Sequence, residues 1–221
     1  MLKLAIYFFL FFGFIFLVLF PPFGLLLLLL GFIFIVIAVA NRKAEVLEDW
    51  SILIKNARGQ RDKIISVTKD LITNSKAPSI EMKEEKVGPG LEIVSFGETR
   101  DFLIVSDRRN TKLSSFKTFI NANDYGDNLF VSWYLTYRPD FWQSLLMLLP
   151  GVKKVLGLDD LNLFNKQDLR AYMTNVHHSL LEAVEKLMLN LNQDPSKIDR
   201  KSRGFLAVSY THLTLPTKRI V

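Results

Sequence analysis

The chain opens on two apolar runs, "LAIYFFLFFGFIFLVLF" (Leu4–Phe20) and "FGLLLLLLGFIFIVIAVA" (Phe23–Ala40), with Pro21 and Pro22 between them. Neither run contains a charged residue. A single helix over both would be about 55 Å long, whereas the hydrocarbon layer of a bilayer is roughly 30 Å thick. The prolines remove backbone donors and disfavour a helix at the preceding residue, so they mark a break. The pattern predicts a hairpin of two transmembrane helices over residues 1–42.

A cleaved signal peptide and a re-entrant wedge confined to one leaflet are the alternatives to this hairpin. A signal peptide has a single apolar core of about 7–15 residues, and both runs are longer. The re-entrant wedge remains an alternative, because the turn is short and carries no polar residue. Lys3 flanks one end of the hairpin, and Arg42 and Lys43 flank the other. The positive-inside rule therefore predicts a cell-membrane protein with both termini in the cytoplasm.

Nearly all of the charge lies after the hairpin. The chain has 28 Lys and Arg against 22 Asp and Glu, a formal net charge of +6. Three of these cations lie outside residues 41–207, which leaves +3 there. Such a mild excess gives no reason to expect a nucleic-acid partner. The absence of cysteine excludes disulfides, thiolate metal sites and cysteine nucleophiles.

The segment after the hairpin has apolar residues spaced by three, four or seven positions. They are Val46, Trp50, Leu53, Ala57, Ile64, Val67 and Leu71. This spacing is typical of one helical face, and we predict a helical stalk over residues 43–75. The stalk is expected to pack as an ordinary amphipathic helix or to pair with another helix. Residues 76–90 hold two prolines and two glycines among mixed charges, and we interpret them as a linker.

An alternation with period two follows the linker. Four short runs rich in β-branched and aromatic residues are separated by turn residues. The runs are Leu91–Phe96, Asp101–Asp107, Phe116–Ala122 and Asn128–Tyr137. They predict an antiparallel sheet of about four strands. Gly126, in the turn before the last run, is expected to take a positive φ angle.

Another apolar stretch lies within Arg138–Leu158, and its apolar-rich part, Phe141–Leu149, is too short to cross a bilayer. Phe141 and Trp142 precede its leucine-rich part, and Lys153 and Lys154 follow it. This order is typical of a helix in the headgroup zone, and we predict that these four residues contact the membrane interface. A short core helix that covers the sheet is the alternative.

The last patterned element is a long helix that begins near Asn165 and ends before Pro195. One apolar stripe runs along it, formed by Leu169, Tyr172, Met173, Val176, Leu180, Val184, Leu187 and Leu191. Asn165 and Asp168 resemble a capping pair at its start. The stripe is expected to pack on the apolar face of the sheet. The fold class predicted for residues 91–207 is therefore a two-layer α+β domain.

Motifs for catalysis and nucleotide binding are absent from the sequence. It has no G-x-S-x-G elbow, no P-loop and no G-x-G-x-x-G loop. His177 and His178 are adjacent, so a helix would point them about 100° apart. His178, Glu182 and Glu185 share a helical face and are the candidates for a metal site. Because no further histidine completes the set, we predict no metal, no cofactor and no catalytic residue, and interpret this face as polar surface.

The last fourteen residues, "VSYTHLTLPTKRIV" (Val208–Val221), follow neither a helical nor a strand pattern. Read back as codons, they resemble the transposase adapter used in the preparation of sequencing libraries. We therefore interpret residues 208–221 as a non-native tail; a β-strand is the alternative. The natural protein is then expected to continue past Leu206 or Ala207, so that the α+β domain is truncated.

These patterns predict a membrane-anchored cytoplasmic binding, scaffolding or regulatory module. Its expected partners are the lipid bilayer and a protein that contacts the sheet or the long helix. One alternative is a membrane-surface enzyme that acts on a lipid or a nucleotide. Another is an accessory subunit of a transport or secretion complex, in which Gly13, Gly24 and Gly31 would let other spans approach the hairpin.

Two arrangements would separate the first two functions. Clustering of Arg100, Arg108, Arg138 and His177 around a deep cavity would favour an enzyme. A flat apolar patch on the sheet, with no cavity, would favour a binding module.

Overall fold

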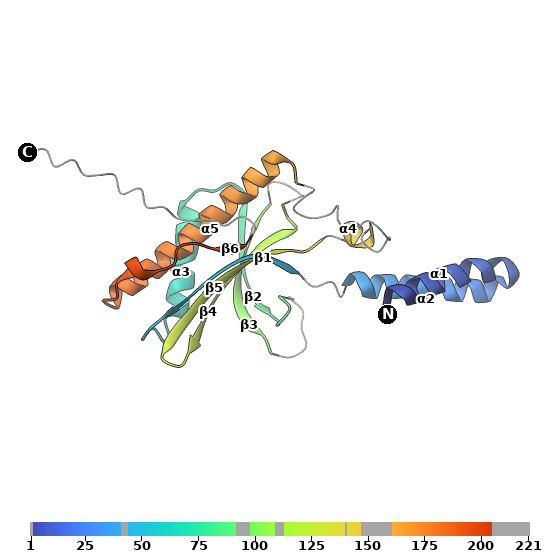
Figure 1. The fold of residues 1–221 in the computed structure, drawn as a ribbon, viewed down its shortest axis with the longest axis horizontal. Helices are drawn as coiled ribbons and strands as arrows, with labels where there is room; N and C mark the ends of the chain where they lie inside the picture. The colour runs from blue at the N-terminus through green and yellow to red at the C-terminus, as the bar shows by residue number, and fades with distance from the viewer. Residues whose placement is uncertain are drawn as a thin grey trace, which may run out of the picture. The chain divides into compact units, whose positions relative to one another are not determined.

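The computed structural model describes residues 2–40, 44–91, 98–108, 113–139, 141–146 and 161–204. These residues form two compact units (Figure 1). The helical unit contains the described residues up to Ala44 and those between Arg138 and Leu161. The sheet unit contains Glu45–Tyr137 and the described residues from Asn162 onward.

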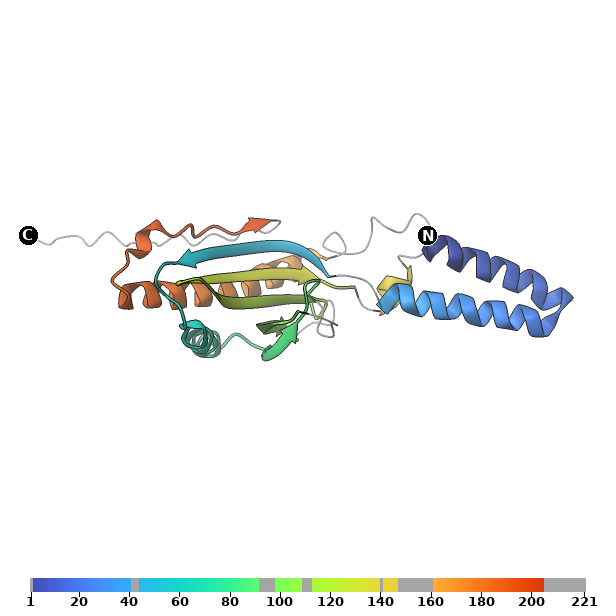
Figure 2. The ribbon, with the colours of Figure 1, turned by 90° about the horizontal axis from the view of Figure 1, so that it is seen from below.

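The helical unit is built on two antiparallel helices, α1 (Leu2–Leu19) and α2 (Pro21–Ala40), joined at Phe20 (Figure 2). The two prolines occupy the first two positions of α2, where a missing backbone N–H breaks no helical hydrogen bond. The carbonyl of Phe20 accepts from the amides of Phe23 and Gly24, both at 3.0 Å. The short helix α4 (Phe141–Leu146) belongs to the same unit.

Aromatic pairs and glycines hold α1 against α2. Phe9 stacks on Phe34 with ring centroids 5.3 Å apart, and Phe16 meets Phe23 edge to face at 5.2 Å. At Gly24 a Cβ atom would lie 2.6 Å from the carbonyl carbon of Phe16 and would also overlap the backbone of Leu17. The tight turn therefore requires glycine at this position.

Gly13 and Gly31 face the opposite helix of the same hairpin. A Cβ at Gly13 would lie 2.9 Å from the Leu28 side chain, and one at Gly31 would lie 3.2 Å from that of Leu10. All three glycines that were considered for contacts with other spans therefore serve the contact between α1 and α2. Among the described residues, Pro21–Val39 is the one helix long and apolar enough to cross a membrane, and Leu4–Leu19 is a shorter apolar helix.

The sheet unit contains a six-stranded antiparallel sheet in the order β2-β3-β4-β5-β1-β6. Its strands are β1 (Glu45–Ile54), β2 (Ile80–Val87), β3 (Arg100–Asp107), β4 (Phe116–Tyr125), β5 (Asn128–Tyr137) and β6 (Arg203–Gly204). The predicted α+β class and antiparallel sheet are confirmed, with more strands than predicted. Gly126, between β4 and β5, has the expected positive φ angle of 62°.

Two parts of the sequence interpretation are wrong, and both concern strands. The predicted helical stalk is a strand over Glu45–Ile54, and only Arg61–Asn74 forms a helix, α3. In β1, Trp50 and Ile54 are buried on one face, so period two describes this segment as well as the helical spacing did. The predicted linker contains β2, an edge strand whose many charges hid its strand pattern.

Helices α3 and α5 (Leu163–Asn190) cover one face of the sheet. The Tyr172 hydroxyl, on α5, donates to the Val105 carbonyl at 2.8 Å and lies 2.7 Å from Thr118 Oγ1. Lys69 of α3 pairs with Glu84 of β2. The predicted apolar stripe of the long helix is buried here from Leu169 to Leu187. It packs on sheet residues that are fully buried, namely Leu103, Val105, Ile120, Val131, Trp133 and Leu135.

The long helix begins earlier than predicted. Asn162 caps it, because its side-chain oxygen accepts from the Asn165 amide at 2.8 Å. The predicted capping pair of Asn165 and Asp168 is therefore wrong, and Asn165 lies buried within the first turn.

After α5 the chain forms a 3₁₀ turn, η3 (Pro195–Lys197), and returns to the edge of β1 as β6. Several predictions fall on other segments. Residues 92–96 of the first predicted strand run, Lys153, Lys154 and the tail over 208–221 lie outside the described residues. Phe141 and Trp142 begin α4, but their side chains lie outside the described part of the structure.

Candidate functional site

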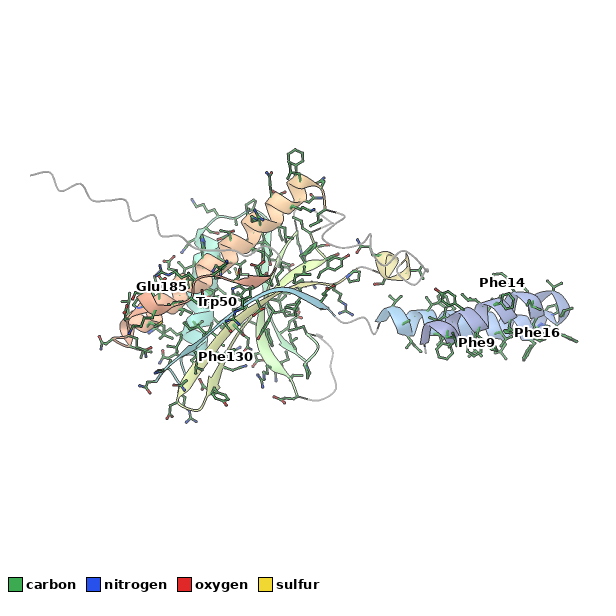
Figure 3. All side chains as sticks on the ribbon, in the orientation of Figure 1. Phe9, Phe14, Phe16, Trp50, Phe130 and Glu185 are labelled. Carbon is green, nitrogen blue, oxygen red and sulfur yellow. The ribbon has the colours of Figure 1, made fainter. Side chains whose placement is uncertain are left out.

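The face of the sheet opposite α5 carries an unusual number of apolar side chains. Side chains alternate along a strand, so the neighbours of Thr118 and Trp133, which contact α5, point to this helix-free face. They include Phe119 and Tyr134, and the antiparallel register adds Phe102 and Phe130. Figure 3 shows Trp50 beside α5 and Phe130 on the strands away from it.

An apolar cleft of about 420 Å³ opens on the helix-free face. Its floor belongs to a small cluster formed by Val87, Phe102, Ile104 and Phe119, against which Leu91 and Tyr134 pack. The lining residues are Val46, Val87, Gly88, Pro89, Leu91, Glu98, Arg100, Phe102 and Tyr134. This volume lies within the usual range for small-molecule sites.

Arg100 supplies the one cationic side chain among the described residues that line the cleft. Its Nη2 atom lies 3.3 Å from Glu98 Oε1, and its side chain is 60% exposed. Arg100 also lines a neighbouring groove of about 640 Å³, together with Leu53, Asn123, Asp124, Tyr125 and Phe130. Leu53 in this groove and Val46 in the cleft are each almost half exposed. A single guanidinium therefore stands between two largely apolar hollows.

The same face has a charged hollow of about 350 Å³ where β2 and β3 pair near Arg108. Glu81 pairs with Arg108 and lies 3.5 Å from Lys83 Nζ. Arg100 and Arg108 therefore line different hollows. Asp107, the last residue of β3, is buried, and Arg109 lies outside the described residues.

His177 lies on α5 and is buried between this helix and the other face of the sheet. Its Nδ1 atom accepts from Trp133 Nε1 at 3.0 Å, so Nε2 carries the proton and donates to the Arg200 carbonyl at 2.9 Å. Burial lowers the pKa of His177 below its usual value. Both ring nitrogens are engaged in structural hydrogen bonds, which leaves neither for substrate. Within the sheet unit, Arg100, Arg108 and His177 therefore do not gather around one cavity. Arg138 belongs to the helical unit.

The metal-site candidates are occupied with other contacts. Glu182 pairs with Lys186 at 2.8 Å, and Glu185 pairs with Arg200 at 2.9 Å. Burial lowers the pKa of His178, and the charge of His177 lowers it further. Within the described residues, no group of three or more His, Cys, Asp or Glu side chains is placed to hold a metal ion.

Sequence reasoning did not identify the role of residues 198–204. Trp50 Nε1 donates to the Asp199 carbonyl at 2.6 Å, and the Ser202 hydroxyl donates to Glu48. Glu48 and Ser202 are both buried. The segment is therefore an integral part of the core at the edge of β1. Trp50 can be read from the sequence, but its partner Asp199, 149 positions away, cannot be predicted from the local pattern.

No protein-family model, curated protein or solved structure matches this chain.

Proposed function

We propose that the chain is a membrane-anchored binding module whose helix-free sheet face takes a ligand with an apolar body and an acidic group. The hairpin of α1 and α2 would be the anchor. Val18, Leu25 and Phe14 are 84%, 66% and 64% exposed, so the outer surface of the hairpin is apolar. A helix that is apolar on all sides is stable only inside a large core or a membrane, which supports a hairpin embedded in lipid.

The orientation follows from the flanking charges. Lys3 lies at one end of the hairpin, and Arg42 and Lys43 lie at the other, while the turn has no basic residue. The positive-inside rule then places both ends of the hairpin and the sheet unit in the cytoplasm.

The observation that carries the binding role is the apolar cleft with Arg100 at its rim. Helices α3 and α5 cover the other face of the sheet, so the cleft faces away from them. A guanidinium beside an apolar lining suits a ligand that combines an acyl or aromatic body with a carboxylate or phosphate. Glu98, which pairs with Arg100, is the one carboxylate among the described residues that line the cleft, and this sparse set of titratable groups favours binding over catalysis.

A photoreactive fatty acid tests the binding role. The full chain, in nanodiscs of neutral lipid, is illuminated with a diazirine-labelled palmitate, and the modified residues are mapped by mass spectrometry. We expect adducts at Val46 and Tyr134. Arg100→Glu should lower them roughly fivefold, the effect expected of one exposed charge pair.

Arg108→Glu is the matched control, because Arg108 lies on the same face but lines the charged hollow. It should leave the adducts at Val46 and Tyr134 unchanged. Equal loss in both variants, or adducts restricted to the hairpin, would contradict a ligand site in the apolar cleft.

A further inference from the structure

We infer that the start of α5 docks on an anionic lipid surface through Leu163, Phe164, Lys166 and Arg170, which we term the α5 docking surface. The inference rests on the proposed membrane hairpin, because it requires the sheet unit to lie near a bilayer. It concerns a surface different from the predicted interface residues Phe141, Trp142, Lys153 and Lys154.

Two large apolar side chains stand exposed side by side at the start of α5. Leu163 is 68% exposed and Phe164 is 73% exposed, although the apolar stripe of the same helix is buried from Leu169 onward. They lie beyond the part of the helix that packs on the sheet. Apolar pairs of this kind are typical of contact with lipid or with another protein.

The contacts of α5 place this pair at one end of the sheet. His177 lies on Trp133, and Tyr172 lies on Thr118, which is the register partner of Leu135. Moving from His177 back to Tyr172 therefore follows β5 toward its last residue, Tyr137. The nine residues from Tyr172 back to Leu163 add about 13 Å of helix. The start of α5 thus extends past the end of the sheet (Figure 1).

That end of the sheet is also where the chain arrives from α2. Glu45, the first residue of β1, pairs with Tyr137. Only residues 41–44 separate it from Ala40, the last residue of α2. At about 3.5 Å for each residue, the chain from Ala40 to Glu45 spans no more than about 18 Å, however the two units are arranged. An α2 that ends at a membrane surface therefore keeps this end of the sheet close to that surface.

The charges next to the apolar pair favour an anionic bilayer over an apolar protein surface. At 100° for each residue, Arg170 projects close to the direction of Leu163, and Lys166 lies beside it. Within the described residues, neither Lys166 nor Arg170 forms an ion pair. Asp168 is the single acid among residues 163–171. Apolar side chains that insert, flanked by basic side chains that meet phosphate, are the usual means of interfacial binding.

A fluorescent label tests the inference directly, because the chain has no natural cysteine. Phe164→Cys and Leu189→Cys each receive an NBD label in the full chain, reconstituted in nanodiscs. Leu189 is the matched control, since it is 59% exposed and lies on the same helix about 38 Å away. With phosphatidylserine present, we expect a blue shift and quenching by lipids with brominated chains at Phe164→Cys only. In phosphatidylcholine alone, both effects should weaken.

Charge removal gives a second readout. Lys166→Gln and Arg170→Gln should each lower the docking equilibrium constant roughly fivefold, as expected for a basic residue at an anionic surface. Equal emission from the labels at Phe164→Cys and Leu189→Cys in both lipids would overturn the inference. The proposed anchor is tested separately by alkaline carbonate extraction. A chain that stays in the membrane while the label at Phe164→Cys remains in water would refute the docking surface alone.

Discussion

Replacement of His177 by leucine tests whether this histidine is structural. The imidazole is fully buried and joins Trp133 of β5 to the Arg200 carbonyl, so it connects the sheet, α5 and the segment that leads to β6. His177→Leu keeps a side chain of similar size but removes both hydrogen bonds. The Trp133 indole N–H then stays buried without an acceptor from α5. Such a buried, unpaired group lowers the free energy of unfolding by about 1–3 kcal/mol. The Arg200 carbonyl also loses its donor, so we expect His177→Leu to cost an amount near the upper end of this range.

The same substitution should change how stability depends on pH. Burial lowers the pKa of His177 in the folded state, whereas the unfolded histidine titrates near its ordinary value of about 6.5. Below that pH the unfolded chain therefore binds more protons than the folded chain. The wild type should lose stability as the pH falls from about 6.5 toward the folded pKa, by at most about 1.4 kcal/mol for each pH unit and histidine. His177→Leu should lose its part of this slope.

Chemical denaturation of the full chain in detergent, followed by circular dichroism at several pH values, measures both effects. His178→Gln is the control for the neighbouring histidine, whose pKa is also lowered and which should supply the slope that remains. The double variant Trp133→Phe with His177→Leu should lose less unfolding free energy than the sum of the losses in the two single variants. Both partners of the hydrogen bond are then apolar, so no buried polar group is left unpaired between them. If His177→Leu is as stable as the wild type at pH 8 and keeps the full slope, the structural role is refuted.

Two further substitutions test the hairpin and the core. Gly24→Ala should lower the melting temperature of the hairpin, followed by circular dichroism in detergent, more than Gly31→Ala does. The new Cβ meets backbone atoms at Gly24 but only side chains at Gly31. Equal effects would contradict the tight turn. Tyr172→Phe removes the hydroxyl that bonds to Thr118 and the Val105 carbonyl, and should lower the free energy of unfolding by about 1–2 kcal/mol in denaturant titrations. No measurable loss would contradict a structural role for this hydroxyl.

Strong periodicity made part of the fold predictable. The long helix buries one regular stripe of apolar residues, and β3, β4 and β5 bury the alternate residues that face it. The strands β3 and β4 also bury Phe102, Ile104 and Phe119 on the opposite face. The first strand was misread because Trp50, Leu53 and Ala57 satisfy helical spacing, while Trp50 and Ile54 also satisfy alternation. Short apolar segments fit both periods, and only the pairing with β5 decides between them.

The site depended on contacts that one sequence does not encode locally. Arg100 was noted as a residue at a strand end, but the cleft beside it needs Val46 and Tyr134 from strands far apart in the chain. His177 was weighed as a catalytic or metal residue because its partners are distant in the chain. Trp133, 44 positions away, donates to its Nδ1 atom, and its Nε2 atom donates to the Arg200 carbonyl, 23 positions away. Leu163 and Phe164 drew no attention in the sequence, because the predicted helix began near Asn165, after both residues. The structure caps the helix at Asn162 and so includes them.

The central claim is that α1 and α2 form a membrane hairpin that holds the sheet unit in the cytoplasm. Labelling of single cysteines with an impermeant maleimide tests it in expressing cells. Phe20→Cys lies between the two helices, and Asp127→Cys lies exposed between β4 and β5. We predict that Phe20→Cys reacts in intact cells and that Asp127→Cys reacts only after the cells are opened. Labelling of Asp127→Cys in intact cells, or release of the unlabelled chain by alkaline carbonate, would contradict the claim.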